Sequence, residues 1–258
     1  QEHKAQGVEF IDLQNVARKN FKFGQVREEY GRASMEYLDK AMGLIAEEKI
    51  DCLVTCPISK EAINLAGYKY SGHTEYLAKK TAAGNVEMML LNKTLKFSLV
   101  TRHIPLKDVP RAITGRRLRE NILITYRGLR ELFGISRPRM AACGLNPHAS
   151  DNGVIGKEEN RIIAPALKII NKGLGRCVDG PISADAAAYK ASRGRYDCVI
   201  AMYHDQALIP LKLSGMDTGV NLTLGLPFIR TSPLHGTAFD IAADSRLINP
   251  GPMIEAIK

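Results

Sequence analysis

The feature that most constrains the fold is a regular alternation of amphipathic helical patterns with short apolar runs. Residues 28 to 48 place apolar side chains at helical spacing, and residues 50 to 55 then read as a buried strand. The pattern recurs as an apolar run at 97 to 101, a helical stripe from 118 to 133 and an apolar run at 140 to 143. This alternation predicts an α/β fold with a largely parallel sheet covered by helices on both faces.

Later segments extend the pattern and then depart from it. A helical period returns at about 158 to 172, where Pro165 removes a backbone donor and clashes with the preceding turn, so we expect a kink or a late helix start. A strand is predicted at 198 to 202. Residues 221 to 242 are rich in Gly, Pro and Thr and show little helical period until their end, which predicts loops around a site. The last residues, 251 to 258, predict a helix within which the sequence ends.

Length and composition are those of an ordinary globular protein of one or two domains. The chain has 258 residues, of which 45% are hydrophobic and 24% charged. No apolar run approaches the roughly 20 residues that a membrane-spanning helix needs, and the first residues lack the apolar stretch of a signal peptide. The five cysteines are an odd number, and three lie in strand-like runs, which suits reduced, buried thiols. We therefore expect a cytoplasmic protein with no membrane partner and no disulfides.

The net charge of +9 is compatible with nucleic acid, a membrane surface or acidic metabolites as partners. The densest basic cluster, residues 115 to 119, opens an amphipathic helix and is explained by a solvated helix face, with polyanion binding as the minority interpretation. No aromatic stacking motif accompanies it, so we expect no nucleic-acid partner.

Histidines gather where strand-like runs end. Four of the six histidines follow such a run: His103, His148, His204 and His235. In open α/β sheets ligands bind beyond the carboxyl ends of the strands, so side chains at these positions converge although they are far apart in sequence. Three neutral imidazoles can hold Zn²⁺, Co²⁺ or a related divalent ion and leave positions open for substrate oxygens. The leading triad is His103, His148 and His204.

Spacing alone leaves these assignments undecided. A single loop histidine is more often a surface or hydrogen-bonded residue than a ligand, and the chain has no compact HExxH or CxxC signature. His73 either faces a bound ligand with Thr74 or belongs to a helix start capped by Thr74 or Ser71. Asp205 either orients the neighbouring His204 or reaches the substrate.

Two cations and an amide lie in the segment after His204. Lys212, Asn221 and Arg230 offer the donors that phosphate or carboxylate groups need, although each alone is more often a solvated surface residue. No GxGxxG follows a strand, so a classical Rossmann site is not expected.

At these motifs the chain closely resembles the 4-hydroxythreonine-4-phosphate dehydrogenase family of vitamin B6 biosynthesis. The resemblance covers nearly the whole chain, with the motifs in family order. It rests on TCPISKEAINLAG, SGHTEYLA, HIPLKDVP, LNPHASDNGVIGKEE, GPISADAAAY, YHDQALIPLK and TSPLHGTAFDIA.

The resemblance implies an isocitrate/isopropylmalate dehydrogenase-like fold: two α/β domains flanking a cleft, in a homodimer whose active sites lie at the subunit interface. The first domain would comprise residues 1–66 and 222–258 and lack its N-terminal strand. The second, residues 67–221, would carry the dimer interface.

Site residues follow from the same motifs. The resemblance implies His103, His148 and His204 as metal ligands, shared with the dimer partner, and His235 as a neighbour of the site. It assigns substrate binding to His73, Thr74, Lys212, Asn221 and Arg230. Lys212 and Asp205 are the candidate general bases, and the cofactor-binding residues are not assigned.

The implied reaction is oxidation of 4-hydroxythreonine 4-phosphate by NAD, or by NADP, followed by loss of the carboxyl group as carbon dioxide to give 3-amino-2-oxopropyl phosphate. A divalent metal (Zn, Mg or Co) chelated by the hydroxyl and carboxylate would favour the alkoxide for hydride departure. It would then stabilise the enolate-like charge as the carboxylate leaves.

Two departures from the family pattern keep alternatives open. The glycine-rich segment of the Gly-Asp-Pro-Ala-Gly-Ile-Gly-Pro-Glu type with which the family normally begins is not found, and Leu234 stands where an acidic residue is common. Sister substrates are phosphorylated threonate or erythronate, or a carboxylated aromatic dihydrodiol. From other classes, a metal-dependent hydrolase or lyase would use the same histidines without nicotinamide, and a non-catalytic binding subunit would keep only the fold.

Overall fold

The computed structural model describes residues 2–5, 7–17, 19 and 21–258. One continuous sheet contains eight strands in the order β3-β10-β9-β4-β5-β8-β6-β7, and β1 and β2 form a separate hairpin. The strands are β1 (Glu2–Ala5), β2 (Val8–Ile11), β3 (Cys52–Val54), β4 (Glu87–Leu91), β5 (Lys96–Leu99), β6 (Met140–Cys143), β7 (Val178–Ile182), β8 (Cys198–Ala201), β9 (Val220–Leu224) and β10 (Ile229–Pro233).

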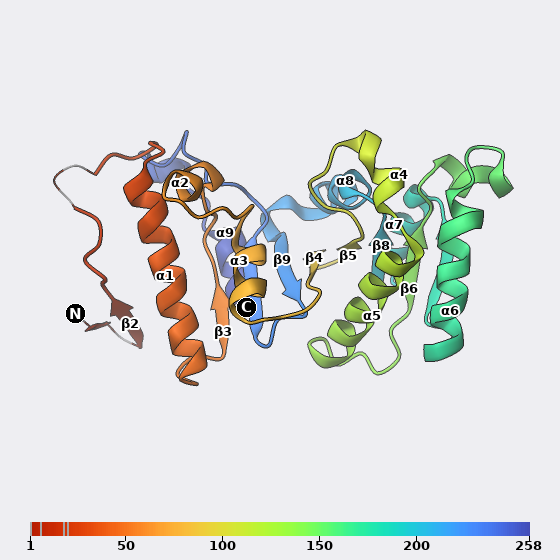
Figure 1. Cartoon of the computed structure of the whole chain (residues 1–258), viewed down its shortest axis with the longest axis horizontal. Coiled ribbons are helices and arrows are strands. Elements are labelled where there is room, and N and C mark those ends of the chain that lie inside the picture. Colours follow the sequence, from red (N-terminus) through yellow and green to blue (C-terminus); the bar gives the residue numbers. More distant parts are fainter. Residues whose placement is uncertain (1, 6, 18, 20) are drawn as a thin grey trace.

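Helices are arranged along the length of this sheet, which follows the long axis of the molecule (Figure 1). They are α1 (Glu28–Ala46), α2 (Lys60–Leu65), α3 (His73–Lys80), α4 (Val109–Ala112), α5 (Gly115–Glu131), α6 (Ala164–Leu174), α7 (Ala184–Ser192), α8 (His204–Gly215) and α9 (Gly251–Ile257). The helices α1 to α3 lie towards the β3 end and α5 to α7 towards the β7 end. None of the described helices is long and apolar enough to cross a membrane.

Strand direction divides the sheet. The strands β5, β8, β6 and β7 are parallel, as predicted, and β10 is parallel to β3. The centre differs, because β10 with β9, β9 with β4 and β4 with β5 are all antiparallel pairs. The short connections 92–95 and 225–228 explain the pairs β4 with β5 and β9 with β10, since a parallel pair needs a longer crossover. The α/β fold is therefore confirmed, and the parallel arrangement holds for one half of the sheet.

The prediction of loops over 221 to 242 is wrong for its first half. β9 and β10 lie within 220 to 233 and are the third and second strands of the sheet, counted from β3. The buried strand predicted at 50 to 55 is also wrong in its burial, because β3 has only β10 as a described neighbour and Cys52 is exposed. All five cysteines are free, with Cys52 and Cys56 exposed and the other three buried.

The predicted helices agree with the structure more closely than the predicted strands do. The pattern at 28 to 48 is α1, and α5 begins directly after Thr114, whose hydroxyl accepts a hydrogen bond from Arg117 N. Pro165 follows directly on a π-helical turn, Glu159–Ile163, in a helical segment that is continuous from residue 158 to Leu174. The segment therefore begins where its period predicts, and the expected late helix start is wrong. The departure from regular α-helical geometry next to the proline is the π-helical turn that precedes it.

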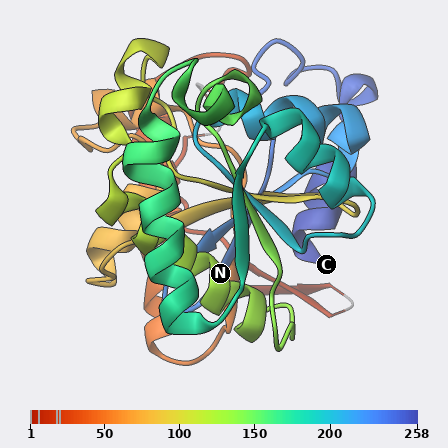
Figure 2. The same ribbon diagram turned by 90° about the vertical axis from the view of Figure 1, so that its right-hand side faces the viewer.

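Two layers of helices cover the parallel half of the sheet, one on each face (Figure 2). Along β6, Met140 and Ala142 pack in the cluster that contains α5 and α6, while Ala141 and Cys143 pack in the cluster that contains α7 and α8. Successive strand residues point to opposite faces, so burial on both sides requires an apolar residue at every position. This explains why the run MAAC has no polar alternation.

A buried ion pair joins the antiparallel centre to α5. The carboxylate of Glu87 on β4 is fully buried and accepts hydrogen bonds from both terminal nitrogens of Arg117, one of them at 2.6 Å. Asn121 Nδ2 donates a further bond of 3.0 Å. Desolvation of this carboxylate is thus offset by charge-assisted hydrogen bonds.

Candidate active site

A cleft of about 460 Å³ lies over one face of the central antiparallel strands. Asn221 lies opposite Ser232 in the register and Arg230 opposite Thr223, so these side chains share one face of the sheet. The walls come from the loop before α2, the start of α3 and the segment after β5. The lining residues that matter below are Cys56, Lys60, His73, Thr74, Glu75, Arg102, His103, Asn221, Arg230 and His235.

Arg230 forms a buried positive charge on the floor of this cleft. Its side chain donates hydrogen bonds to Thr55 Oγ1 at 2.7 Å and Thr223 Oγ1 at 3.2 Å, and the residue is 3% exposed. Its Nε and the Oδ1 of Asn221 are buried without a hydrogen-bond partner. Burial lowers the pKa of Arg230 to about 10, so the guanidinium stays charged at neutral pH. A buried cation with an unused donor is suited to an anionic ligand.

His73 lies beside this charge as a neutral imidazole. Burial, followed by the charge of Arg230, lowers the pKa of His73 to about 4. The N-cap of α3 is Gly72, and no side chain caps this helix end. The interpretation of Thr74 or Ser71 as a cap is therefore wrong, and His73 and Thr74 both line the cleft.

Cations outnumber carboxylates in the lining. Lys60 and Arg102 join Arg230, whereas Glu75 is the one carboxylate among the described lining residues. Arg102 lies 3.9 Å from Glu75 and 3.7 Å from the buried Glu87. The cleft is electropositive, which favours phosphate or carboxylate ligands.

His103 and His204 are brought together by the parallel strands β5 and β8. Their ring centroids are 5.8 Å apart. Thr101 fixes this approach, because its N–H and its hydroxyl both donate to Met202 O, at 3.2 and 2.7 Å. Burial, then the charge of Lys60, lowers the pKa of His103, which favours the neutral imidazole that a metal requires.

Asp205 contacts His204 rather than the cleft. Its Oδ1 lies 2.7 Å from His204 Nδ1. This contact favours a proton on Nδ1 and leaves the Nε2 lone pair available to a ligand. The geometry thus supports the interpretation of Asp205 as a residue that orients His204.

His148 lies in the loop Pro147–Gly153 and is exposed. Gln206 links this region to His204, because its side chain accepts from Met202 N and donates to Gly144 O, both at 2.8 Å. Among the described residues no three of His, Cys, Asp and Glu are placed to hold a metal ion together. The structure therefore brings two of the three predicted ligands together within one chain.

Lys212 and His235 mark a second, apolar pocket of about 550 Å³. This pocket shares His235 and Gly236 with the cleft, and Lys212 lines only the pocket. His235 reaches the cleft from another direction than His103, because β10 runs antiparallel to β5 through three successive antiparallel pairs.

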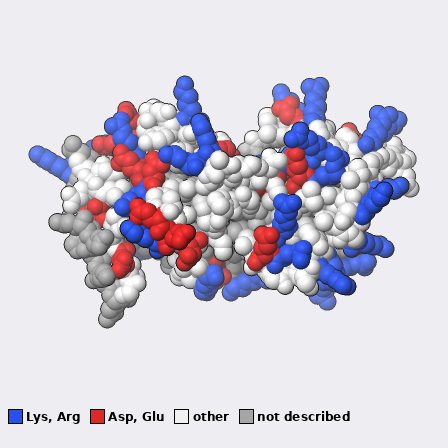
Figure 3. Space-filling view, turned by 60° about the horizontal axis from the view of Figure 1, so that its bottom comes forward, with Lys and Arg blue, Asp and Glu red and all other residues white. Residues whose placement is uncertain are grey.

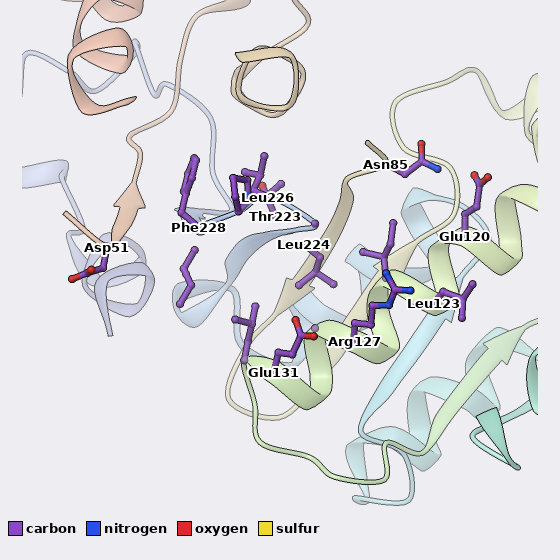
Figure 4. Close-up of a pocket in the computed structure, with 16 residues that line it drawn as sticks. Asp51, Asn85, Glu120, Leu123, Arg127, Glu131, Thr223, Leu224, Leu226 and Phe228 are labelled. Atoms are coloured by element: carbon purple, nitrogen blue, oxygen red, sulfur yellow. The ribbon is translucent and has the colours of Figure 1, made fainter. Parts of the chain in front are cut away.

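A larger cavity of about 790 Å³ lies elsewhere, between α5 and the turn joining β9 to β10 (Figure 4). Glu120, Arg127 and Glu131 of α5 face Leu226 and Phe228 of the turn across it. It contains none of the predicted site residues.

Sequence reasoning missed several residues of the cleft. Lys60, Glu75 and Arg102 each lie within or next to a motif that had been singled out, in TCPISK, SGHTE and TRH. Adjacency to a predicted site residue was the available signal, but nothing in the sequence shows which neighbour turns towards the cleft.

The family described as Pyridoxal phosphate biosynthetic protein PdxA matches residues 1–258. A 4-hydroxythreonine-4-phosphate dehydrogenase of Sulfurihydrogenibium sp. (strain YO3AOP1) is 46% identical over 252 residues, 98% of this chain and 76% of that protein. A D-threonate 4-phosphate dehydrogenase of Cupriavidus necator (strain ATCC 17699) is 41% identical over 97% of this chain and 74% of that protein.

Solved structures agree with these relatives. The crystal structure of 4-hydroxythreonine-4-phosphate dehydrogenase from Klebsiella pneumoniae superposes with a TM-score of 0.84 at 40% identity, over 93% of this chain and 72% of that one. The family model, the similar sequences and the solved structure thus identify the same family over nearly the whole sequence. The chain belongs to the PdxA family.

Proposed function

We propose that the chain is an NAD-dependent dehydrogenase that oxidises and decarboxylates 4-hydroxythreonine 4-phosphate. The observation that carries this proposal is the buried guanidinium of Arg230, with its unpartnered Nε, in a cleft that also contains neutral His73 and His103. The names of six relatives that share 42–49% identity support this substrate. The product would be 3-amino-2-oxopropyl phosphate.

The anionic groups of the substrate bind to the cationic lining. Arg230 and Asn221 supply a charged donor and an amide on the cleft floor, and Lys60 and Arg102 add charge on its walls. His73 and Thr74 donate from the start of α3 without adding charge, because His73 is neutral at physiological pH. Lys212 lines the adjoining pocket. It either binds the same anionic end of the substrate or accepts the proton of the substrate hydroxyl.

The imidazoles of His103 and His204 fit a divalent metal ion. Their rings are 5.8 Å apart, and Asp205 holds His204 with its Nε2 free. His148 would complete the set, and in a homodimer it could come from the other subunit. A bound divalent ion supplies Lewis acidity for alkoxide formation and for the charge that develops on decarboxylation.

The apolar pocket beside the cleft fits a nicotinamide cofactor, NAD or NADP. Its volume of about 550 Å³ is in the range of small-molecule sites, and His235 and Gly236 line both cavities. A ring bound there would lie next to a substrate in the cleft. The cofactor supplies the hydride acceptor, while the chain's own residues position the alcohol and exclude water.

Lys212 is the better of the two candidate general bases. Asp205 is engaged with His204 at 2.7 Å, whereas Lys212 lines the pocket that adjoins the cleft. Replacing Lys212 by Met should reduce oxidation while leaving Zn²⁺ binding unchanged.

Oxidation of D-threonate 4-phosphate is the second candidate, because the Cupriavidus necator relative is 41% identical. The two substrates differ at C2, which carries an amine in one and a hydroxyl in the other. Glu75 is the one carboxylate among the described lining residues and is suited to an ammonium group. This favours the amino substrate.

The test is NADH formation by purified protein with NAD and added Zn²⁺ or Mg²⁺. We expect kcat/KM to be highest for 4-hydroxythreonine 4-phosphate and lower for threonate, erythronate and dihydrodiol substrates. Preference for D-threonate 4-phosphate would select the second candidate. No NADH from any of these compounds, with folded and metal-loaded protein, would overturn the proposal.

A further inference from the structure

The loop that carries His148 has an unusual backbone. Five consecutive residues, from His148 to Asn152, have positive φ angles of 54°, 50°, 69°, 43° and 57°. Residues other than glycine rarely adopt this region, and they stay in it only where the surrounding structure holds them. Something outside the loop must therefore fix its path.

Glu159 holds the segment that leads into this loop. Glu159 is 1% exposed, and its Oε1 accepts hydrogen bonds from Leu145 N at 2.8 Å and Asn146 N at 2.7 Å. Its Oε2 accepts from Asn146 Nδ2 at 3.0 Å. One buried carboxylate thus binds both backbone amides that lead into Pro147 and His148. These hydrogen bonds outweigh the effect of burial and lower the pKa of Glu159, which keeps it ionised.

Two further features show that this arrangement is close-packed. A Cβ on Gly144 would lie 2.8 Å from Ala149 Cα and 3.1 Å from Glu159 Oε1, so the loop folds back over a glycine. Gly144 O accepts from Gln206, two residues after His204. The bend held by Glu159 is therefore tied directly to the segment that carries another predicted ligand.

We propose that Glu159 is a positioning residue that sets where the loop presents His148 to the metal. The inference rests on the proposed function, in which His148 is a ligand. Glu159 acts through backbone amides and touches no reacting group. It comes from a π-helical turn, a feature frequent at functional sites, which places its carboxylate under the loop.

The test compares Glu159→Gln and Glu159→Ala with Glu158→Gln in the full chain. Glu158 is the matched control, because it contacts the side-chain amide of Asn146 at 2.9 Å but neither backbone amide. Zn²⁺ affinity is measured by competition with a chromophoric chelator. Hydrogen exchange at the amides of residues 145 and 146 and the unfolding temperature are measured on the same samples.

We expect Glu159→Ala to weaken Zn²⁺ binding by about 10- to 100-fold, the usual effect of removing a residue that orients a ligand, and to speed exchange at both amides. Glu159→Gln, which keeps one acceptor oxygen, should fall between it and wild type, and it carries the test if the alanine variant does not fold. Glu158→Gln should stay within about twofold of wild type.

Two results overturn the inference and are distinguishable. Unchanged Zn²⁺ affinity in the Glu159 variants, with a lowered unfolding temperature, would leave Glu159 a purely structural role while the proposed function stands. Unchanged Zn²⁺ affinity in His148→Ala would remove His148 from the ligand set and thereby contradict the metal site on which the inference depends.

Discussion

Arg230 is the residue in which burial, charge and an unused donor coincide. The sequence marked it as a candidate but gave no sign of its burial, because the segment that contains it was predicted as loops. The strand β10 places its side chain under the cleft between Thr55 and Thr223. Arg230 could thus be singled out from the sequence. Its burial could not, because it depends on β10, a strand that the sequence did not predict.

Replacing Arg230 by Lys should raise KM for the phosphorylated substrate by about 10- to 100-fold, the effect of losing one or two charge-assisted hydrogen bonds. Lysine keeps the charge but not the planar donor set. Steady-state kinetics measure the change. Arg246→Lys is the control, because Arg246 is exposed and its ion-pair partner among the described residues is Asp244. A similar rise in KM there would argue against a specific role for Arg230.

The depressed pKa of His73 predicts a pH dependence of stability. Unfolded, this imidazole binds a proton below about pH 6.5, whereas in the folded chain its pKa is about 4. As the pH falls, the unfolded state therefore binds this proton before the folded state does. The free energy of unfolding falls by about 1.5 kcal/mol between pH 6.5 and pH 5. In His73→Asn this contribution should be absent. Denaturant unfolding at both pH values measures the difference, and equal losses in the two proteins would contradict the assignment.

At the scale of elements, α1 and α2 approach each other at a glycine. A Cβ on Gly31 would lie 2.0 Å from the carbonyl oxygen of Ala62 and 2.2 Å from its carbonyl carbon. Both contacts are with backbone, so the helices would have to separate to admit a side chain. Their spacing matters for the cleft, because α2 begins at Lys60 in its wall.

Gly31→Ala should therefore lower the free energy of unfolding by about 1–3 kcal/mol, the range for overpacking a core contact. Gly43→Ala in the same helix is a control of opposite sign. Its Cβ would meet nothing within 4 Å, so alanine should stabilise the chain by about 0.5–1 kcal/mol through helix propensity. Chemical denaturation separates the two, and a stabilised Gly31→Ala would refute the close packing.

Elements with a strong period were predictable, and those defined by long-range pairing were not. α1 and α5 show clear apolar stripes, and the helical period from about residue 158 gave the segment that contains α6. β9 and β10 were missed because Gly225 and Pro227 obscured a two-residue period that is short in each strand. The pairing of β9 with β4 and of β10 with β3 brings together residues more than a hundred positions apart, which no local pattern reports.

Across the whole molecule, positive charge is concentrated in one segment, residues 102 to 196. Residues 102 to 196 contain 18 Lys and Arg against 8 Asp and Glu, so this segment accounts for the net charge of the chain. In Figure 3 blue side chains dominate the right-hand end of the surface. The ion pair of Glu87 with Arg117 joins this segment to β4.

Arg117→Met should destabilise the chain by about 3–5 kcal/mol, because it leaves the fully buried carboxylate of Glu87 without its bidentate partner. Arg116→Met, one residue away, removes an exposed guanidinium paired with Glu120 and should leave the denaturation midpoint near that of wild type. Equal midpoints for both variants would mean that Glu87 finds another partner.

The division into domains 1–66 with 222–258 and 67–221 stays a prediction. The proposed boundary between residues 221 and 222 falls inside β9, which pairs with β10 on one side and β4 on the other. Sequence motifs carry no information on how one sheet joins residues from the two predicted domains.

This continuous sheet also determines how the cleft can move. Its two walls are connected through the backbone hydrogen bonds of β10, β9 and β4, without a flexible segment between these strands. Closing around a substrate therefore requires the strands β10, β9 and β4 to twist further. The change is distributed over many small changes of their backbone angles. Ligand binding should be opposed by an elastic restoring force that helps the walls to separate when the product leaves.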